Sequence, residues 1–133
     1  MANLMEYLQQ AVSHEASDLF LVAGGAANEK VDGHIRPLDG ERLLPPETEQ
    51  LVSEIYRLAN RPMAHFMETG DDDFSFSVAG LARFRVNAYR QRGSMAAVIR
   101  IVSFDIPHWQ ELGIPAGVMD LADTQNGMVL VTG

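Results

Sequence analysis

Arginine is the residue type in this sequence that is best placed to do chemistry. Lys30 is the single lysine, and five of the nine arginines lie between Arg83 and Arg100. The planar guanidinium group donates paired hydrogen bonds that match phosphate oxygens, so grouped arginines are typical of an anion site. The alternative is a strand face whose arginines are solvated.

Two adjacent strands are predicted to position these arginines. From Leu81 to Gln91, apolar and polar residues alternate with a period of two, as in a half-buried strand. Arg92-Gly93 is a two-residue turn, and Met95–Val102 returns as the next strand. This register sets Gln91 opposite Ser94 and Arg85 opposite Arg100. Because opposed residues point the same way, one face is expected to carry Arg83, Arg85, Asn87 and Arg100.

Like charges directly opposite each other repel, so the arginines require a neutralising partner. A bound phosphate is one possibility, and the carboxylates of Asp71–Asp73 on a neighbouring strand are another. A shift of one residue in the register would move Arg100 to the opposite face and dissolve the cluster.

The end of the chain carries a second signal. Val129–Thr132 is an apolar segment, predicted as a strand, that leads into Gly133. A strand running into a glycine is how a phosphate-binding loop begins, but the lysine and hydroxyl residue of such a loop do not follow. An ordinary C-terminal strand is the alternative interpretation.

Other kinds of site are not indicated. The four histidines lack metal-ligand spacing, and Asp71–Asp73 lacks the alternating ligands and glycine of a calcium loop. Gly24-Gly25 is expected to be a turn only. We expect no catalytic centre in these 133 residues, since an unrecognised enzyme site would need convergent polar residues that the pattern does not supply.

Composition limits the possible partners. The length of 133 residues suits one domain with a real core, and the net charge of −8 argues against nucleic-acid or anionic-membrane binding. The chain has no cysteine, no apolar stretch long enough to span a bilayer and no secretory signal at its N-terminus. A cytoplasmic protein without membrane insertion is therefore expected.

The predicted elements define an α+β fold with a mostly antiparallel sheet. A first helix starts after Asn3, a strand follows at 17–22, and Asp32-Gly33 turns a hairpin over 29–38. A second helix starts at Pro45-Pro46. Asn60 caps a short third helix that buries Phe66 and Met67 and stops at Gly70. We predict a domain over 1–102, a linker over 103–114 and the start of a second domain over 115–133.

Six segments, in order, carry a resemblance to a known family. They are Ala16–Leu21, Val31–Gly33, Asp73–Phe76, Ala82–Tyr89, Glu111–Gly113 and Gly127–Gly133. Together they resemble the N-terminal domain of the type IV pilus retraction ATPases, the twitching motility PilT family of the secretion-ATPase superfamily. The match runs from the first helix to the last residue. The chain departs from the family at Gly24–Asn28, where members often have a Gly-x-Pro-Pro stretch.

The resemblance implies a PAS-like fold and a role in a larger machine. Members are cytoplasmic homohexamers that hydrolyse ATP with Mg²⁺ to depolymerise pili, and they act with the pilus machinery at the inner membrane. Gly133 matches the first glycine of Walker A. Phosphate contacts fall by resemblance on Arg83 and Arg85, and less directly on Arg92 and Arg100. The catalytic residues lie in the following domain, so this chain alone is expected neither to hydrolyse ATP nor to hold it tightly.

Two functional alternatives stay open at this point. The first is a free-standing PAS-like small-ligand sensor or interaction module. A sensor would bind its ligand in an apolar pocket within the sheet, whereas a filled core would count against it. Within the superfamily, the sequence does not separate a retraction ATPase from its accessory paralogue or from the assembly motor.

Overall fold

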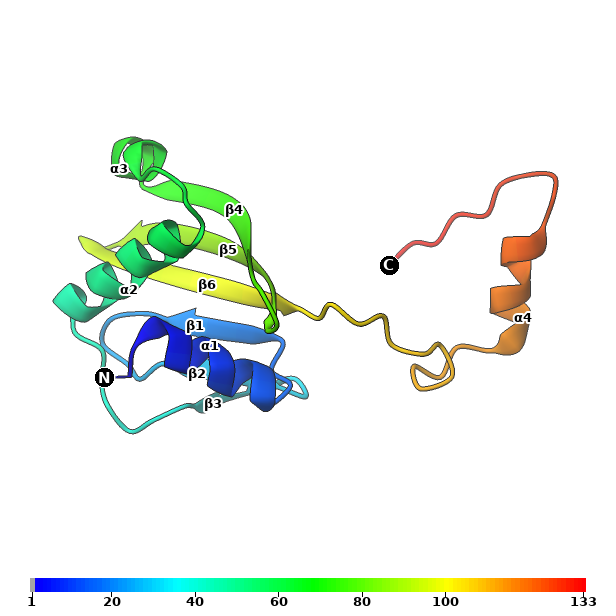
Figure 1. Ribbon diagram of the computed structural model, residues 1–133, viewed down its shortest axis with the longest axis horizontal. Coiled ribbons are helices and arrows are strands. Elements are labelled where there is room, and N and C mark those ends of the chain that lie inside the picture. Colours follow the sequence, from blue (N-terminus) through cyan, green and yellow to red (C-terminus); the bar gives the residue numbers. More distant parts are fainter. Residues whose placement is uncertain (1) are drawn as a thin grey trace.

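One antiparallel sheet organises the protein. The computed structural model describes residues 2–133, and its six strands lie in the order β3-β2-β1-β6-β5-β4 (Figure 1). The strands are β1 (Asp18–Leu21), β2 (Asn28–Val31), β3 (His34–Pro37), β4 (Asp71–Val78), β5 (Ala82–Gln91) and β6 (Ser94–Val102). The helices are α1 (Leu4–Ser13), α2 (Pro45–Leu58), α3 (Ala64–Thr69) and α4 (Ala116–Met119), followed by the 3-10 helix η1 (Asp120–Asp123). The predicted α+β class is confirmed.

Local chemistry sets the ends of the first two helices. The Asn3 carboxamide accepts a hydrogen bond from the Glu6 N–H at 2.9 Å, and the Glu6 carboxylate accepts one from the Asn3 N–H at 3.0 Å. This reciprocal capping box satisfies two N–H groups that a helix start leaves unpaired. Helix α2 begins instead with Pro45 and Pro46, which have no N–H to satisfy.

Two tight turns set the register of the sheet. Asp32 and Gly33 have φ values of 50° and 80°, and Arg92 and Gly93 have 52° and 80°. Positive φ at both central residues is the requirement of a type I′ hairpin turn, whose twist suits antiparallel strands. The predicted pairing of Gln91 with Ser94 is confirmed. Edge strand β3 ends at Pro37, as expected for a residue that cannot donate to a ladder.

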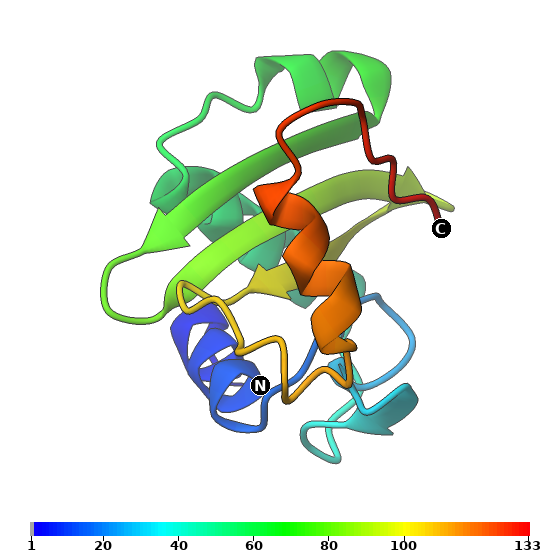
Figure 2. The ribbon, with the colours of Figure 1, turned by 90° about the vertical axis from the view of Figure 1, so that its right-hand side faces the viewer.

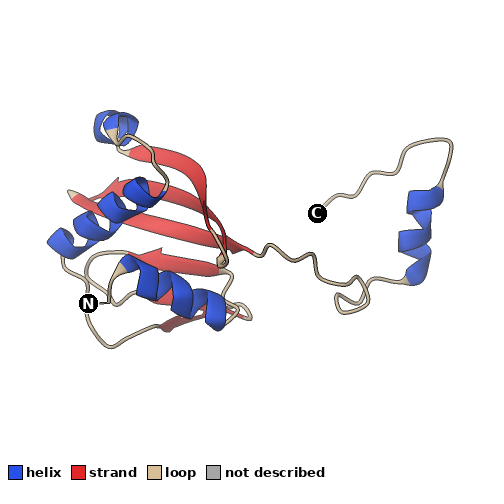
Figure 3. Cartoon of the chain, viewed as in Figure 1, coloured by secondary structure: helices blue, strands red, loops and turns tan. Residues whose placement is uncertain are grey.

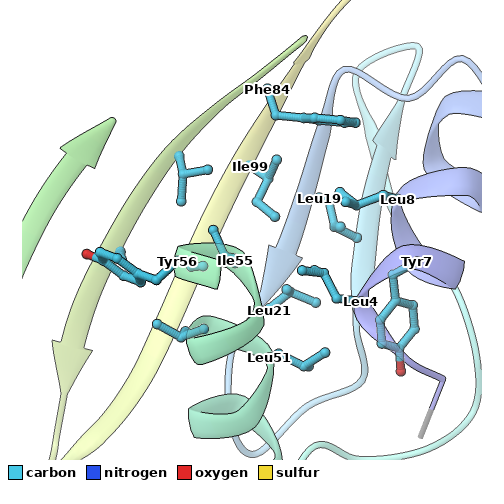
Figure 4. Packing of buried hydrophobic residues seen from close by; sticks show 14 of the residues in the cluster. Leu4, Tyr7, Leu8, Leu19, Leu21, Leu51, Ile55, Tyr56, Phe84 and Ile99 are labelled. Carbon is cyan, nitrogen blue, oxygen red and sulfur yellow. The ribbon is translucent and has the colours of Figure 1, made fainter. Parts of the chain in front are cut away.

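The core lies between the sheet and the two longer helices. Figure 3 shows α1 and α2 on the same side of the sheet. In Figure 4, Leu19, Leu21, Phe84 and Ile99 of the strands point toward side chains of these helices. The cluster is closed by large, fully buried side chains, among them Tyr7, Tyr56, Phe66 and Leu51. Burial on this scale is the main driving force for folding.

Three sequence-based expectations are wrong. Helix α3 starts at Ala64 rather than after Asn60, which has a left-handed φ of 50°, and Met67 is 51% exposed. The helix has only six residues, so it buries one side chain, Phe66, and Arg90 contacts the Met67 sulfur from outside at 3.3 Å. Residues 128–132 form no strand, because no strand of the described residues pairs with them.

The segment after β6 separates from the sheet. Figure 1 shows it leaving the end of β6 and carrying α4 away, and Figure 2 views the molecule from that side. Most of its apolar side chains are exposed, including Ile106, Leu130 and Val131. Along residues 2–133, no helix combines the length and the apolar character needed to cross a bilayer.

A buried hydrogen-bond network attaches strand β4 to the helices. The Asp72 carboxylate accepts hydrogen bonds from the Tyr56 hydroxyl at 2.8 Å and from two Arg61 nitrogens at 2.9 and 3.0 Å. The Arg61 hydrogen bonds hold the pKa of Asp72 below its usual range, although burial opposes this. Burial, and then the hydrogen bond to Asp72, raise the pKa of Tyr56.

This network predicts an acid-dependent loss of stability. The folded-state pKa of Asp72 lies below the unfolded value of about 3.9. Its stabilising contribution is therefore present above about pH 4 and lost as pH falls through the folded-state pKa. Asp72→Asn should cost roughly 2 kcal/mol of unfolding free energy at pH 7 and flatten the loss below pH 4, measured by urea unfolding from pH 2 to 7.

Asp73→Asn is the matched control, because Asp73 is the next residue on β4 and is exposed. It should change the unfolding free energy by less than about 0.5 kcal/mol. If Asp72→Asn kept the pH profile of the unchanged chain, the ionised Asp72 would not be the stabilising form.

Candidate functional site

The predicted arginine face exists. Ala82, Phe84, Val86 and Ala88 of β5 are buried against the helices, so the intervening residues lie on the opposite face of the sheet. Arg85 is directly opposite Arg100 of β6, as the register predicted. The exposed face therefore carries Arg83, Arg85, Asn87 and Arg100 together.

A single row of charges crosses this face from strand to strand. Lys30 of β2 lies opposite Asp18 of β1, Asp18 lies opposite Arg100, and Arg100 lies opposite Arg85. Opposed residues share a face, so these four side chains are neighbours on the helix-free side of the sheet. Two cations, Arg100 and Arg85, are directly adjacent in the row and repel each other.

Carboxylates hold two of the arginines loosely. Arg100 Nε donates to Asp18 Oδ1 at 3.3 Å, and Ser17 Oγ donates to the other Asp18 oxygen at 2.8 Å. The Arg85 terminal nitrogen is 4.0 Å from Asp73, and both of these side chains are 65% exposed. An exposed pair such as Arg85 with Asp73 contributes at most about 1 kcal/mol. They orient the guanidinium groups without occupying all of their donors.

The carboxylates of Asp71–Asp73, the alternative to a bound phosphate, neutralise the arginine face only in part. Asp73 approaches Arg85, Asp71 accepts a hydrogen bond from Asn87 at 3.0 Å, and Asp72 lies on the other face with Arg61. Within residues 2–133, Arg83 has no carboxylate partner. Arg83, together with the donors that Asp73 and Asp18 leave unused on Arg85 and Arg100, can therefore donate hydrogen bonds to an external anion.

Beside these side chains the surface forms a shallow depression of about 220 Å³. It is lined by Asp18, Asp73, Arg85, Val86, Asn87, Val98 and Arg100. An anion in this depression would meet guanidinium donors from two strands and the Asn87 carboxamide. Bidentate donation from rigid strands suits a phosphate group. No cluster of three metal-ligating side chains occurs among the described residues.

The other two predicted residues lie apart from this face. Arg92 is in the β5–β6 turn, seven residues along the strand from Arg85, which corresponds to roughly 20 Å. Gly133 is the last residue of the exposed C-terminal segment. The sequence reasoning missed Asp18 and Lys30, which only the pairing of β1 and β2 brings into the row.

Relatives with known roles match almost the whole chain. The type IV pilus retraction ATPase PilT of Pseudomonas aeruginosa is 38% identical over 133 residues, which cover 98% of this chain and 38% of the relative. The type IV pilus ATPase PilU of the same organism is 33% identical, over 95% of this chain and 32% of the relative. The chain thus spans about a third of the length of the curated relatives that it matches. No protein-family model matches the chain.

Solved structures agree with these relatives. A crystal structure of the pilus retraction motor PilT with bound ADP superposes with a TM-score of 0.73 at 36% identity, covering 93% of this chain and 36% of that one. The Legionella pneumophila ATPase DotB superposes with a TM-score of 0.62 at 22% identity, over 95% of this chain and 36% of that one, which shows a shared fold. The chain is therefore homologous along nearly its whole length to the PilT family of type IV pilus retraction ATPases, and it has the α+β fold of their N-terminal domain.

Proposed function

We propose that this chain is the nucleotide-sensing and oligomer-forming N-terminal domain of a hexameric ATPase that powers type IV pilus retraction. The observation that carries the proposal is the exposed face with Arg83, Arg85 and Arg100, in a chain homologous to the PilT ATPases. These arginines contact the phosphates of ATP bound, with Mg²⁺, on the ATPase domain. The chain itself supplies phosphate contacts rather than catalysis.

The physical basis is electrostatic. Phosphoryl transfer depends mainly on positioning and on stabilising charge, so an arginine from a second domain can complete a site only when that domain approaches. Arg100 and Arg85 repel each other while the face is empty, and a phosphate between them relieves the repulsion. Nucleotide binding therefore favours a closed arrangement of the two domains. This couples nucleotide state to domain rotation.

The C-terminal segment supports a division of the chain into domains. In the proposal, residues 1–102 form the sensing domain, 103–114 form a linker, and 115–133 begin the ATPase domain, with Gly133 opening Walker A. The segment exposes Phe104, Ile106, Leu112, Met128 and Leu130. Many exposed large apolar side chains within one segment are typical of a segment that another part of a protein covers.

The same proposal places the protein in its cellular setting. The homohexamer works at the cytoplasmic face of the inner membrane, where it acts on the pilus machinery, and it neither inserts into the membrane nor binds nucleic acid. The alternative of a PAS-like sensor with a ligand inside the sheet is not favoured. Tyr7, Leu8, Phe84 and Ile99 are fully buried and fill the space between the helices and the sheet.

Pyrophosphate should bind the arginine face of the 133-residue chain. In a titration in low-salt buffer, binding is expected to change the backbone amide chemical shifts of residues 83–87 and 98–102. Arg83→Gln combined with Arg85→Gln should weaken the affinity for pyrophosphate, obtained from these shifts, at least about tenfold. Asp73→Asn should strengthen binding a few-fold, because it removes the carboxylate beside Arg85. Shifts in these residues that survived the double substitution would count against the proposal.

In the full-length ATPase, Arg85→Gln should lower kcat for ATP hydrolysis by about tenfold or more, because the transferred phosphate loses a charge-assisted donor. Arg57→Gln is the control, since Arg57 is an exposed arginine of α2 on the other side of the sheet. Steady-state phosphate release measures both. Equal activity of the two variants would show that Arg85 does not contribute to ATP hydrolysis.

A further inference from the structure

A second cavity lies outside the arginine face, at the end of the sheet where the β5–β6 turn meets the start of α2. Its volume is about 390 Å³, within the range of small-molecule sites. Three segments line it: residues 22–24 that follow β1, the loop that leads into α2, and the β5–β6 turn with the first residues of β6. The lining residues are Val22, Ala23, Gly24, Arg42, Leu43, Leu44, Pro45, Gln91, Arg92, Ser94, Met95 and Ala96.

Two guanidinium groups meet at this cavity without a carboxylate. Arg42 and Arg92 come from different segments, and no aspartate or glutamate is among the lining residues. In the part of the chain that the structure describes, neither arginine has an ion pair or a side-chain hydrogen bond. The chain has 18 acidic residues and 10 lysines and arginines. Two unpaired arginines beside one cavity are therefore unusual in so acidic a protein.

The walls are fixed by the backbone. Gly24 N–H donates to the Leu43 carbonyl at 2.9 Å, and Leu43 N–H donates to the Gly25 carbonyl at 2.8 Å, so the loop carrying Arg42 is tied to the end of β1. Leu43 and Ala96 are fully buried beneath the cavity, and the apolar surface that it exposes comes from Val22, Leu44 and Met95, which are partly or largely exposed. The site is preformed, which reduces the entropic cost of binding.

Arg92 occupies a strained position. Its φ of 52° is in the left-handed region, where asparagine or glycine is favoured in a type I′ turn. An arginine there costs about 1 kcal/mol relative to residues that tolerate this conformation. The strained backbone sets the Arg92 side chain at the cavity, opposite the loop of Arg42.

The start of helix α2 does not supply the anion-binding groups. Pro45 and Pro46 have no N–H, and the Leu44 N–H already donates to the Glu47 carboxylate at 2.6 Å. The polar groups left to contact a ligand are the two guanidinium groups and the side chains of Gln91 and Ser94. The apolar surface adds contact area for a hydrophobic body.

We propose that this cavity binds a small organic anion that combines an apolar body with a phosphate or a pair of carboxylates. Arg42 and Arg92 hold the anionic group from two sides, and the apolar side chains of Val22, Leu44 and Met95 contact the body. The site is roughly 20 Å along β5 from Arg85 and does not rest on the proposed contact with ATP. Ligand binding at the turn would stiffen the hairpin that carries the arginine face.

The test is a titration of the 133-residue chain with 1-naphthyl phosphate, followed by backbone amide and arginine Nε–Hε chemical shifts. Shifts should concentrate in residues 22–24, 42–45 and 91–96. Pyrophosphate has the anionic group without the apolar body, and 1-naphthol has the apolar body without the phosphate. Each should bind this site at least about tenfold more weakly than 1-naphthyl phosphate. A parallel titration with succinate, which carries two carboxylates and no phosphate, shows whether the site recognises carboxylates or phosphate.

Arg42→Gln combined with Arg92→Asn should weaken 1-naphthyl phosphate binding at least about tenfold, since two charge-assisted donors are lost. Asparagine suits the turn, so this variant should keep the unfolding midpoint of the unchanged chain. Arg83→Gln combined with Arg85→Gln is the control that should leave this site unchanged, which keeps the two proposals separable.

Three results would overturn the proposal. One is 1-naphthyl phosphate binding that the Arg42→Gln and Arg92→Asn variant retains. Another is a set of shifts confined to residues 83–87 and 98–102. The third is an acidic peptide, Asp-Glu-Asp-Phe, binding residues 42–45 and 91–96 more tightly than the organic phosphate, which would make the cavity a protein-docking site.

Discussion

The register of the β5–β6 hairpin is the constraint on which the rest of this structure depends. A two-residue turn at Arg92-Gly93 sets it, and strand alternation then sends every second side chain to the same face. Apolar residues on one face pack under α1 and α2, so the opposite face must carry the arginines. A shift of one residue would place Arg83 and Arg85 in the core. The energy of core burial therefore holds the charged face in place.

Acidic residues have two distinct functions in the sheet, according to the face on which they lie. Asp72 is buried, and its hydrogen bonds with Tyr56 and Arg61 fasten β4 to the segment between α2 and α3. Asp18 and Asp73 lie on the arginine face and contact Arg100 and Arg85 at the longer distances of 3.3 and 4.0 Å. The side chains of Arg85 and Arg100 are 65% and 68% exposed, so water weakens these pairs and a phosphate can compete for the guanidinium groups.

Local signals in the sequence predicted much of the fold. The helix start after Asn3, the turn at Arg92-Gly93 and the face shared by Arg85 and Arg100 all depend on neighbouring residues or on one tight turn, and all are confirmed. The network of Asp72 and the contact of Asp18 with Arg100 were missed. Both join residues brought together by tertiary packing, and 82 positions separate Asp18 from Arg100. The burial of Met67 was predicted wrongly because a six-residue helix can turn only one side chain inward.

The two outer strands of the sheet have backbone groups that could pair with another molecule. One outer strand, β3, has only four residues and ends at Pro37, while the other, β4, begins with three consecutive aspartates, Asp71–Asp73. Short length, proline and clustered like charge each discourage the strand of a second chain from extending a sheet. The run Asp71–Asp73 thus protects the β4 edge of the sheet from pairing with another chain. Such protection against aggregation benefits a protein that leaves one broad face of its sheet accessible.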